Sequence, residues 1–265
     1  MTKSAPCDPA LARPPARPLR VLVLGGTAEA RALARRIGAD PRLDGVVSLA
    51  GRTGEPLPQD LPARIGGFGG VEGLVRFLSD NAIDKVVDAT HPFAARISAN
   101  AQAACARLDL PLVAYARAPW TPVAGDRWTC VANNAEAAQA LGEEPRRVFL
   151  AIGRLGVADF RAAPQHDYLL RVIDPAPPED LPPRCETIRA RGPFDLTGET
   201  ALLRERRIEV LVSKNSGGPA TYAKIEAARR LGIAVAMVAP PPADGAAVVR
   251  DLDAVMAFLA PGGAP

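Results

Sequence analysis

The sequence of 265 residues lacks both a long apolar run and a surplus of one charge. No stretch approaches the ~20 apolar residues that a helix needs to cross a bilayer. The formal net charge is only +3, and basic residues are scattered in pairs such as Arg35-Arg36 and Arg229-Arg230. A protein that binds nucleic acid usually concentrates its basic residues on one face. We therefore expect neither a membrane nor a nucleic acid as a partner.

Cysteine is also scarce. Cys7, Cys105, Cys130 and Cys185 stand far apart, with no Cys-x-x-Cys pair and no histidine cluster nearby. This spacing suggests neither a zinc site nor a disulfide framework, so we expect no metal and a reducing, cytoplasmic setting. Residues 1–18 are rich in Pro, Ala and Arg and lack the apolar core of a secretion signal, which predicts a disordered leader.

The sequence is rich in short apolar runs that alternate with helical patterns. Strands are expected at 20–24, 45–50, 84–89, 112–115, 128–132, 148–152, 168–173, 209–213 and 234–238. Helices are expected near 28–38, 71–80, 93–107, 134–142, 196–206, 219–231 and 251–259. This rhythm predicts an α/β protein with two Rossmann-like domains, each a parallel sheet flanked by helices. We place the domains at 19–117 and 118–265, and whether the chain crosses back at its C-terminus stays open.

The first strand runs into Gly25-Gly26-Thr27, where a doubly wound sheet would bind a phosphate. Glycine allows close approach of the backbone, and Thr27 can cap a helix that starts at Ala28. The full G-x-G-x-x-G pattern is absent, because Glu29 stands where it would continue. Gly26, Thr27 and Ala28 are therefore candidate cofactor ligands, with a purely structural turn as the alternative.

The second strand is followed by Gly51-Arg52-Thr53, with no carboxylate in that place. An NAD site usually has an acidic residue there for the ribose hydroxyls, whereas an NADP site tolerates an arginine. Arg52 can form a fork onto a 2′-phosphate, and Thr53 adds a hydroxyl. Together with the first turn, this pattern favours NADPH over NADH. The alternative is a solvated arginine in a polar loop.

Two further loops are predicted at the same edge of the sheet. One is the glycine cluster that contains Gly67, Phe68 and Gly69, where the backbone can pass close to a cofactor and Phe68 can form a wall. The other follows the strand at 84–89 and carries Thr90 and His91. We count all five as candidate cofactor ligands. A flexible turn and a structural histidine are the respective alternatives.

Six stretches in this order resemble the precorrin-6A reductase and cobalt-precorrin-6A reductase family of cobalamin biosynthesis. They are LGGTAEAR, AGRT, GGFGG, DATHPFAARISANA, RAPW and SKNSGG. The resemblance runs from about Leu19 to the C-terminus. It implies a reductase whose NADPH lies on the N-terminal domain and whose tetrapyrrole substrate, precorrin-6A, lies in an active-site cleft between the domains. The product would be precorrin-6B, and neighbouring enzymes of the pathway are candidate partners.

Hydride addition to a conjugated ring also requires a proton. Lys214, at the end of an apolar strand and before a glycine turn, is the candidate catalytic acid, because partial desolvation lowers the pKa of a lysine. Alternatively, Lys214 binds a substrate carboxylate or caps a loop, and the proton comes from ordered water. Ser213, Asn215 and Ser216 are candidate substrate ligands through an anion-binding turn.

A substrate with many acetate and propionate groups needs distributed cations, since arginine binds carboxylates in a bidentate fork. The candidate substrate-binding residues at predicted strand ends, loops and helix starts are Arg96, Arg117, Trp120, Arg154, Arg171 and Arg191. Each arginine can instead be a surface residue. Trp120 offers a flat apolar wall.

Two other functions compete with this interpretation. One is an NADPH reductase of another small molecule, but the Tyr-x-x-x-Lys pair of short-chain reductases is absent, since Tyr222 is followed by Lys224. The other is a non-catalytic NADP-binding regulatory protein. That function explains Arg52 and the glycine turns, but not the polar loops around His91 and Lys214.

Overall fold

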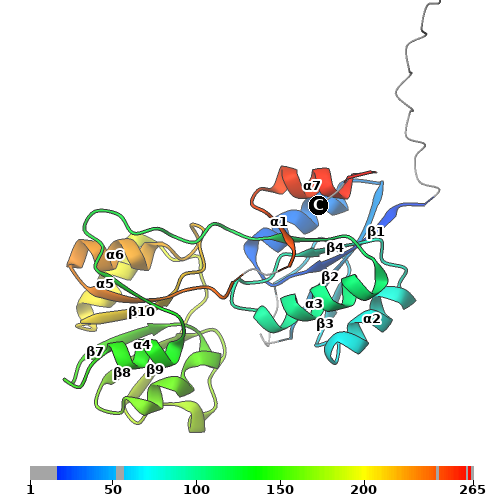
Figure 1. Cartoon of the computed structure of the whole chain (residues 1–265). Coiled ribbons are helices and arrows are strands. Elements are labelled where there is room, and N and C mark those ends of the chain that lie inside the picture. The colour runs from blue at the N-terminus through cyan, green and yellow to red at the C-terminus, as the bar shows by residue number, and fades with distance from the viewer. Residues whose placement is uncertain (1–16, 52–56, 243–244, 261, 264–265) are drawn as a thin grey trace, which may run out of the picture.

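The computed structural model describes residues 17–51, 57–242, 245–260 and 262–263. Figure 1 shows two lobes that two chain segments connect. Residues 1–16 of the expected leader, together with Arg52 and Thr53, lie outside the described residues. Arg17, which we expected in the leader, donates hydrogen bonds to both carboxylate oxygens of Asp84, at 2.8 and 2.9 Å. The last part of the expected leader therefore contacts the first lobe.

The first lobe contains a parallel sheet in the order β12-β5-β4-β1-β2-β3. Its strands are β1 (Leu19–Leu24), β2 (Leu43–Leu49), β3 (Ala63–Ile65), β4 (Lys85–Asp88), β5 (Leu112–Tyr115) and β12 (Ala247–Val249). The order reverses beside β1, as it does in a doubly wound dinucleotide-binding fold. The expected Rossmann-like architecture is confirmed here.

Alternate residues of β1 belong to two different cores, since successive side chains of a strand point to opposite faces. Val21 and Val23 pack with α1 (Ala28–Gly38) and α7 (Leu252–Leu259). Leu22 and Leu24 pack with α2 (Gly70–Asp80) and α3 (Ala95–Leu108). Figure 1 shows α1 and α7 side by side on one face of the sheet. The sheet is therefore buried on both faces, which explains its continuous apolar strands.

The second lobe repeats this three-layer plan with the strand order β6-β11-β10-β7-β8-β9, all parallel. Its strands are β6 (Trp128–Val131), β7 (Arg147–Ala151), β8 (Asp167–Val172), β9 (Cys185–Arg189), β10 (Val210–Lys214) and β11 (Ala234–Val238). Its helices are α4 (Asn134–Ala140), α5 (Leu196–Glu205) and α6 (Ala223–Leu231), and its 3-10 turns are η1 (Arg154–Gly156), η2 (Ala158–Ala162) and η3 (Pro178–Asp180). One core holds α4, and the opposite core holds α5 and α6.

The expected elements are present within a few residues of their predicted bounds, with three differences. The strands β3, β9 and β12 were not predicted, because β9 is only partly buried and β3 and β12 have three residues each. Helix α6 begins at Ala223, four residues later than expected. The assignment of all of 118–265 to one second domain is corrected, because β12 pairs with β5 and α7 packs on the first sheet. The chain thus crosses back, and the crossing completes the first sheet.

Candidate active site

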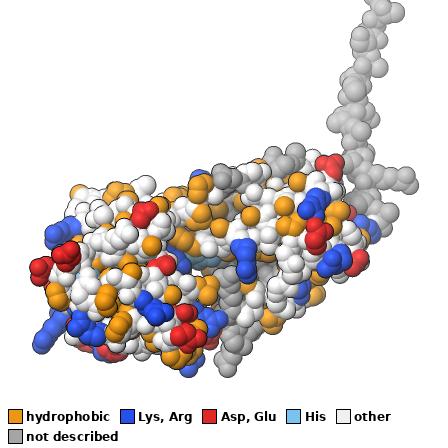
Figure 2. All heavy atoms as spheres, turned by 60° about the horizontal axis from the view of Figure 1, so that its bottom comes forward, with side chains coloured by type: hydrophobic (Ala, Val, Ile, Leu, Met, Phe, Trp, Pro, Cys, Tyr) orange, Lys and Arg blue, Asp and Glu red, His pale blue; other side chains and the backbone are white. Residues whose placement is uncertain are grey.

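The crevices of the two sheets lie where the strand order reverses, between β1 and β4 in the first and between β7 and β10 in the second. Ligands of open α/β sheets bind outside the carboxyl ends of the strands at such points. Predicted site residues lie in the loops after β1, β3 and β4 and at the end of β10 with the turn that follows it. Phe93, which follows β4, packs against the core of the second lobe, so the two crevices approach each other. Figure 2 shows the surface hollowed where the lobes meet.

The turn after β1 joins the strand to a capped helix. Thr27 caps α1 as expected, because its Oγ1 accepts the N–H of Ala30 at 3.1 Å and donates to the carbonyl of Ala89 at 2.8 Å. The second bond fixes the turn to the end of β4. Gly25 is required by packing, since a Cβ there would lie 2.9 Å from Val47 Cγ1. Gly26 has a φ of +112°, which favours glycine.

The same turn fits a dinucleotide. A Cβ added to Gly26, Gly67 or Gly69 would meet no heavy atom of the described residues within 4 Å, so the backbone of both glycine loops is open to a ligand. Ala28 is the first residue of α1, and the first N–H groups of a helix have no partner within it. Such N–H groups and the helix dipole bind pyrophosphate. Gly51, two residues after the end of β2, has a φ of +68°, which also favours glycine.

The loop after β3 is fixed by Arg64, which sequence analysis did not single out. Its guanidinium donates to the carbonyls of Gly66 and Gly67, at 2.9 and 3.2 Å, and to Ser48 Oγ at 3.0 Å. The guanidinium also lies 3.9 Å from the centre of the Phe68 ring. Phe68 packs edge-on against Phe77 of α2, so its ring belongs to the core side of the loop. The open side of this loop is glycine backbone.

The loop after β4 holds a neutral histidine. Thr90 Oγ1 donates to Asp88 Oδ1 at 2.6 Å, which fixes the start of the loop. His91 Nδ1 accepts the N–H of Phe93 at 3.2 Å, so the ring proton belongs on Nε2. Although His91 keeps an exposed edge, surrounding protein lowers its pKa to about 4, chiefly by desolvation and then by the charges of Arg117, Lys214 and Lys224. The crevice is thus electropositive around a neutral imidazole.

The turn after β10 faces this loop. Lys214 Nζ lies 5.2 Å from the centre of the Phe93 ring. Ser213 is fully buried in the strand, and Ser216 is also buried. Asn215 donates to and accepts from the backbone of Trp120, at 2.9 and 2.7 Å. Its amide therefore organises the chain around Lys214 and is not directed at a ligand.

A family model described as Precorrin-6x reductase CbiJ/CobK matches residues 20–260. The chain belongs to this family. It is 57% identical over 220 residues to a precorrin-6A reductase of a Sinorhizobium species, covering 83% of this chain and 84% of the relative. A solved structure of CobK precorrin-6A reductase superposes with a TM-score of 0.86 at 50% identity, covering 93% of this chain and 98% of that one. A cobalt-precorrin-6A reductase of Priestia megaterium is 29% identical, covering 90% and 97%.

Membership in this family confirms the resemblance, the two-sheet fold and an oxidoreductase activity. The arginines expected to bind substrate have different environments in this reductase. Arg171 is buried and paired with Glu199, so it is not available to a substrate carboxylate. Arg117 pairs with Glu29 at 3.4 Å. Arg154 follows β7 at the crevice and donates to the carbonyl of Pro175 at 3.3 Å.

The remaining candidates lie nearer the surface of the reductase. Arg96 is exposed in the first turn of α3, and Arg191 is exposed after β9. Trp120 is partly buried against the second core, with its ring 4.9 Å from Lys224 Nζ and 5.6 Å from the Tyr222 ring. The tryptophan is therefore mainly a packing residue.

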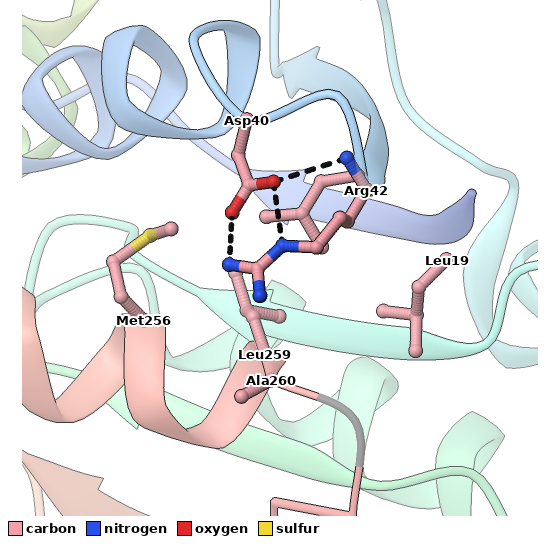
Figure 3. Close-up of a pocket in the computed structure, with 7 residues that line it drawn as sticks. Leu19, Asp40, Arg42, Met256, Leu259 and Ala260 are labelled. Atoms are coloured by element: carbon pink, nitrogen blue, oxygen red, sulfur yellow. Dashed lines mark hydrogen bonds and ion pairs between the residues drawn. The ribbon is translucent and has the colours of Figure 1, made fainter. Parts of the chain in front are cut away.

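The small cavity in Figure 3 is not this site. It lies at the amino ends of β1 and β2, at the opposite edge of the sheet, and holds about 10 Å³, the space of about one water. Asp40 and Arg42 beside it form an ion pair at 2.7 Å.

Within the described residues, no group of three or more His, Cys, Asp or Glu side chains could hold a metal ion. No described helix is long and apolar enough to cross a membrane.

Two further polar residues of the crevice escaped sequence analysis. Glu29 was noted only as a break in the glycine pattern, yet a carboxylate beside an expected phosphate needs a nearby cation to offset the repulsion. Lys224 was considered only for its spacing from Tyr222, and it is buried and donates to the carbonyl of Thr221 at 2.7 Å. Desolvation lowers the pKa of Lys224 to about 7, with Arg171 contributing in the same direction.

Proposed function

We propose that this reductase transfers hydride from NADPH to precorrin-6A and forms precorrin-6B in the cytoplasm, as a step of cobalamin biosynthesis. The proposal rests on one observation, that two crevices lined by different chemical groups lie next to each other. One has open glycine backbone at a helix N-terminus, and the other has Lys214 at a turn that faces it. A nucleotide and an anionic ring can thus lie in contact.

The nucleotide would be held by the first lobe. N–H groups at the start of α1 would bind the pyrophosphate, and the open loop at Gly67 and Gly69 would let the dinucleotide approach the backbone. Arg52 and Thr53 would bind the 2′-phosphate, because Arg52 stands where an NAD site usually has a carboxylate. When bound, NADPH supplies the hydride.

The tetrapyrrole would be held between the lobes by charge and by a proton donor. Lys214 would donate the proton to the ring, while Ser213 and Ser216 would hold the shape of its turn. His91 is neutral at pH 7, so it would donate a hydrogen bond through Nε2–H and carry no charge. Arg96, Arg154 and Arg191 remain the proposed contacts of the peripheral carboxylates.

We further propose that the substrate contains no cobalt. The support is the difference in identity between the relative named precorrin-6A reductase and the one named cobalt-precorrin-6A reductase. Supplying both macrocycles to one preparation tests this part. A kcat/KM that is higher for the cobalt form would contradict it.

The test of the main proposal is anaerobic incubation of the protein with precorrin-6A and NADPH, followed through the absorbance of both chromophores. We expect both to be consumed in equal amounts, with NADH a much poorer donor. A regulatory protein would bind the nucleotide and show no turnover. A reductase of another small molecule would leave the tetrapyrrole spectrum unchanged.

A further inference from the structure

The chain that leaves the first sheet is attached to the turn after β10. Trp120 donates its backbone N–H to Asn215 Oδ1 at 2.7 Å and its indole N–H to the carbonyl of Gly218 at 2.9 Å. Asn215 Nδ2 donates to the carbonyl of Trp120 at 2.9 Å. These three bonds hold segment 117–120 along the turn that carries Lys214. Any shift of this segment would therefore also move the turn.

Arg117, at the start of this segment, lies between the two crevices. Its guanidinium is 3.4 Å from Glu29 Oε1 on α1, and both side chains are largely buried, with 17% and 20% exposed. On its other side, a Cβ on Gly218 would lie 2.5 Å from Arg117 Cδ. A Cβ on Gly217 would lie 2.2 Å from the carbonyl oxygen of Ala118. The two glycines thus let Arg117 and Ala118 approach the turn.

Glu29 makes this contact electrostatically significant. It lies in the first turn of α1, beside the expected pyrophosphate. An unpaired carboxylate there would repel phosphate, whereas the Arg117 guanidinium compensates its charge. The second carboxylate oxygen, Oε2, is buried and accepts no hydrogen bond from the described residues. The environment of Glu29 is therefore sensitive both to the nucleotide and to the position of Arg117.

We propose that Arg117 and Glu29 are positioning residues that couple the nucleotide turn after β1 to the Lys214 turn after β10. Glu29 of the first lobe pairs with the guanidinium. Gly217 and Gly218 of the second lobe leave room for the aliphatic part of the Arg117 side chain. Binding at one turn then orders the other, so that hydride donor and proton donor are aligned on one substrate. This inference rests on the proposed binding of NADPH at the first turn, and it assigns Arg117 a role other than that of a substrate-carboxylate ligand.

Kinetics of Glu29→Gln, Arg117→Ala and the double variant separate the two roles of Arg117. Coupling predicts that each single variant lowers kcat about tenfold at saturating NADPH, because misplacement of about 1 Å is costly in a reacting complex. The Kd for NADPH should rise in Arg117→Ala, which leaves the Glu29 carboxylate unpaired beside the pyrophosphate, but not in Glu29→Gln. The double variant should be no slower than either single one, since both break the same contact. If Arg117 instead binds substrate, Arg117→Ala raises the KM for the tetrapyrrole and Glu29→Gln lowers it, and this result would overturn the coupling.

A pair of glycine substitutions provides a control for backbone strain. Gly218 has a φ of +72° and Gly232 a φ of +69°, but a Cβ on Gly232 would meet no described heavy atom within 4 Å. Both Gly218→Ala and Gly232→Ala should lower the Tm through backbone strain, and Gly218→Ala should lower it more, because its Cβ also meets Arg117. Only Gly218→Ala displaces Arg117, so only this variant should lower kcat. Equal kcat for the two variants would contradict the proposal.

Hydrogen exchange gives a readout that does not depend on turnover. In the wild-type protein, addition of NADPH should slow amide exchange in residues 214–222 of the second lobe. It should also slow exchange in the glycine turn after β1, called the first turn below. Glu29→Gln and Arg117→Ala should keep the protection at the first turn and lose it in 214–222. Protection of 214–222 that persists in both variants would refute the coupling. Absence of protection at the first turn in wild type would instead refute NADPH binding there.

Discussion

Lys214 Nζ lies 5.2 Å from the centre of the Phe93 ring, although Lys214 ends a strand of the second sheet and Phe93 follows a strand of the first. Phe93 comes from the loop after β4, beside the first turn, and its ring packs against the core of the second lobe. The contact brings the carboxyl edges of both sheets together. A ligand on the first turn therefore faces the turn of Lys214, and the predictions below follow from this arrangement.

Replacement of Lys214 by methionine should lower kcat about 100-fold at saturating substrate, which is the usual contribution of a general acid. Binding of NADPH, measured by titration, should stay unchanged. Lys214→Arg is the control, because a guanidinium keeps the charge but does not release its proton at neutral pH. If Lys214→Arg retains the wild-type kcat, the lysine acts as a charge and not as an acid.

Replacement of Arg52 by alanine should raise the KM for NADPH about tenfold or more, since a charge-assisted hydrogen bond to the 2′-phosphate is lost. The kinetic constants with NADH should hardly change, because NADH lacks that phosphate. Arg204→Ala, on α5 of the other lobe, should affect neither cofactor. An equal loss with NADPH and NADH would refute the assignment of Arg52.

The buried ion pair of Arg171 and Glu199 should control the stability of the second lobe. Their side chains are only 8% and 3% exposed, and the guanidinium lies 3.8 Å from the centre of the Phe194 ring. Arg171→Met leaves a buried carboxylate without its partner and should cost about 3–5 kcal/mol in urea unfolding.

The matched control for this pair is the more exposed ion pair of Arg206 and Glu186. Arg206→Ala should cost less than about 1 kcal/mol, as surface pairs do. The double variant Arg171→Met/Glu199→Leu should be more stable than Arg171→Met, because it removes the isolated charge. If the double variant is less stable than the wild type, the ion pair is itself net stabilising relative to the apolar pair that replaces it.

Stability should fall as the pH drops below about 6.5 because of the buried His166. His166 is fully buried, and desolvation lowers its pKa from the usual 6.5, while a contact with the backbone of Gly142 opposes this by less. The unfolded chain then binds the proton first, so the stability present above pH 6.5 is lost at lower pH. His91, with a pKa of about 4, acts in the same direction.

The measurement is the Tm of wild type and His166→Leu between pH 8 and pH 5. The Tm of wild type should decrease on the acid side more steeply than that of the variant, which keeps only the contribution of His91. The ring of His166 also packs edge-on against Tyr168, so the variant is expected to be less stable at pH 8. Parallel pH profiles would contradict the role of His166.

Much of the site could be predicted because strand ends and helix starts are local features. Thr27 caps α1 as the sequence indicates, because its Oγ1 accepts the N–H of Ala30 at 3.1 Å. Such local features do not distinguish the buried Arg171 from Arg154. Both follow or end apolar strands, and only the packing of α5 under β8 shows that Arg171 faces a buried carboxylate.

The sequence by itself determined the two parallel sheets, the glycine turn after β1 and the polar loops that contain His91 and Lys214. These features follow from the periodicity of side chains and from backbone preferences, which act over a few residues. Only the tertiary structure decided that β12 returns to β5, that Arg117 reaches Glu29 and that Asn215 bonds to Trp120. Those contacts join residues about 90 or more positions apart, and the closure of such distances depends on the packing of whole lobes and not on any local pattern.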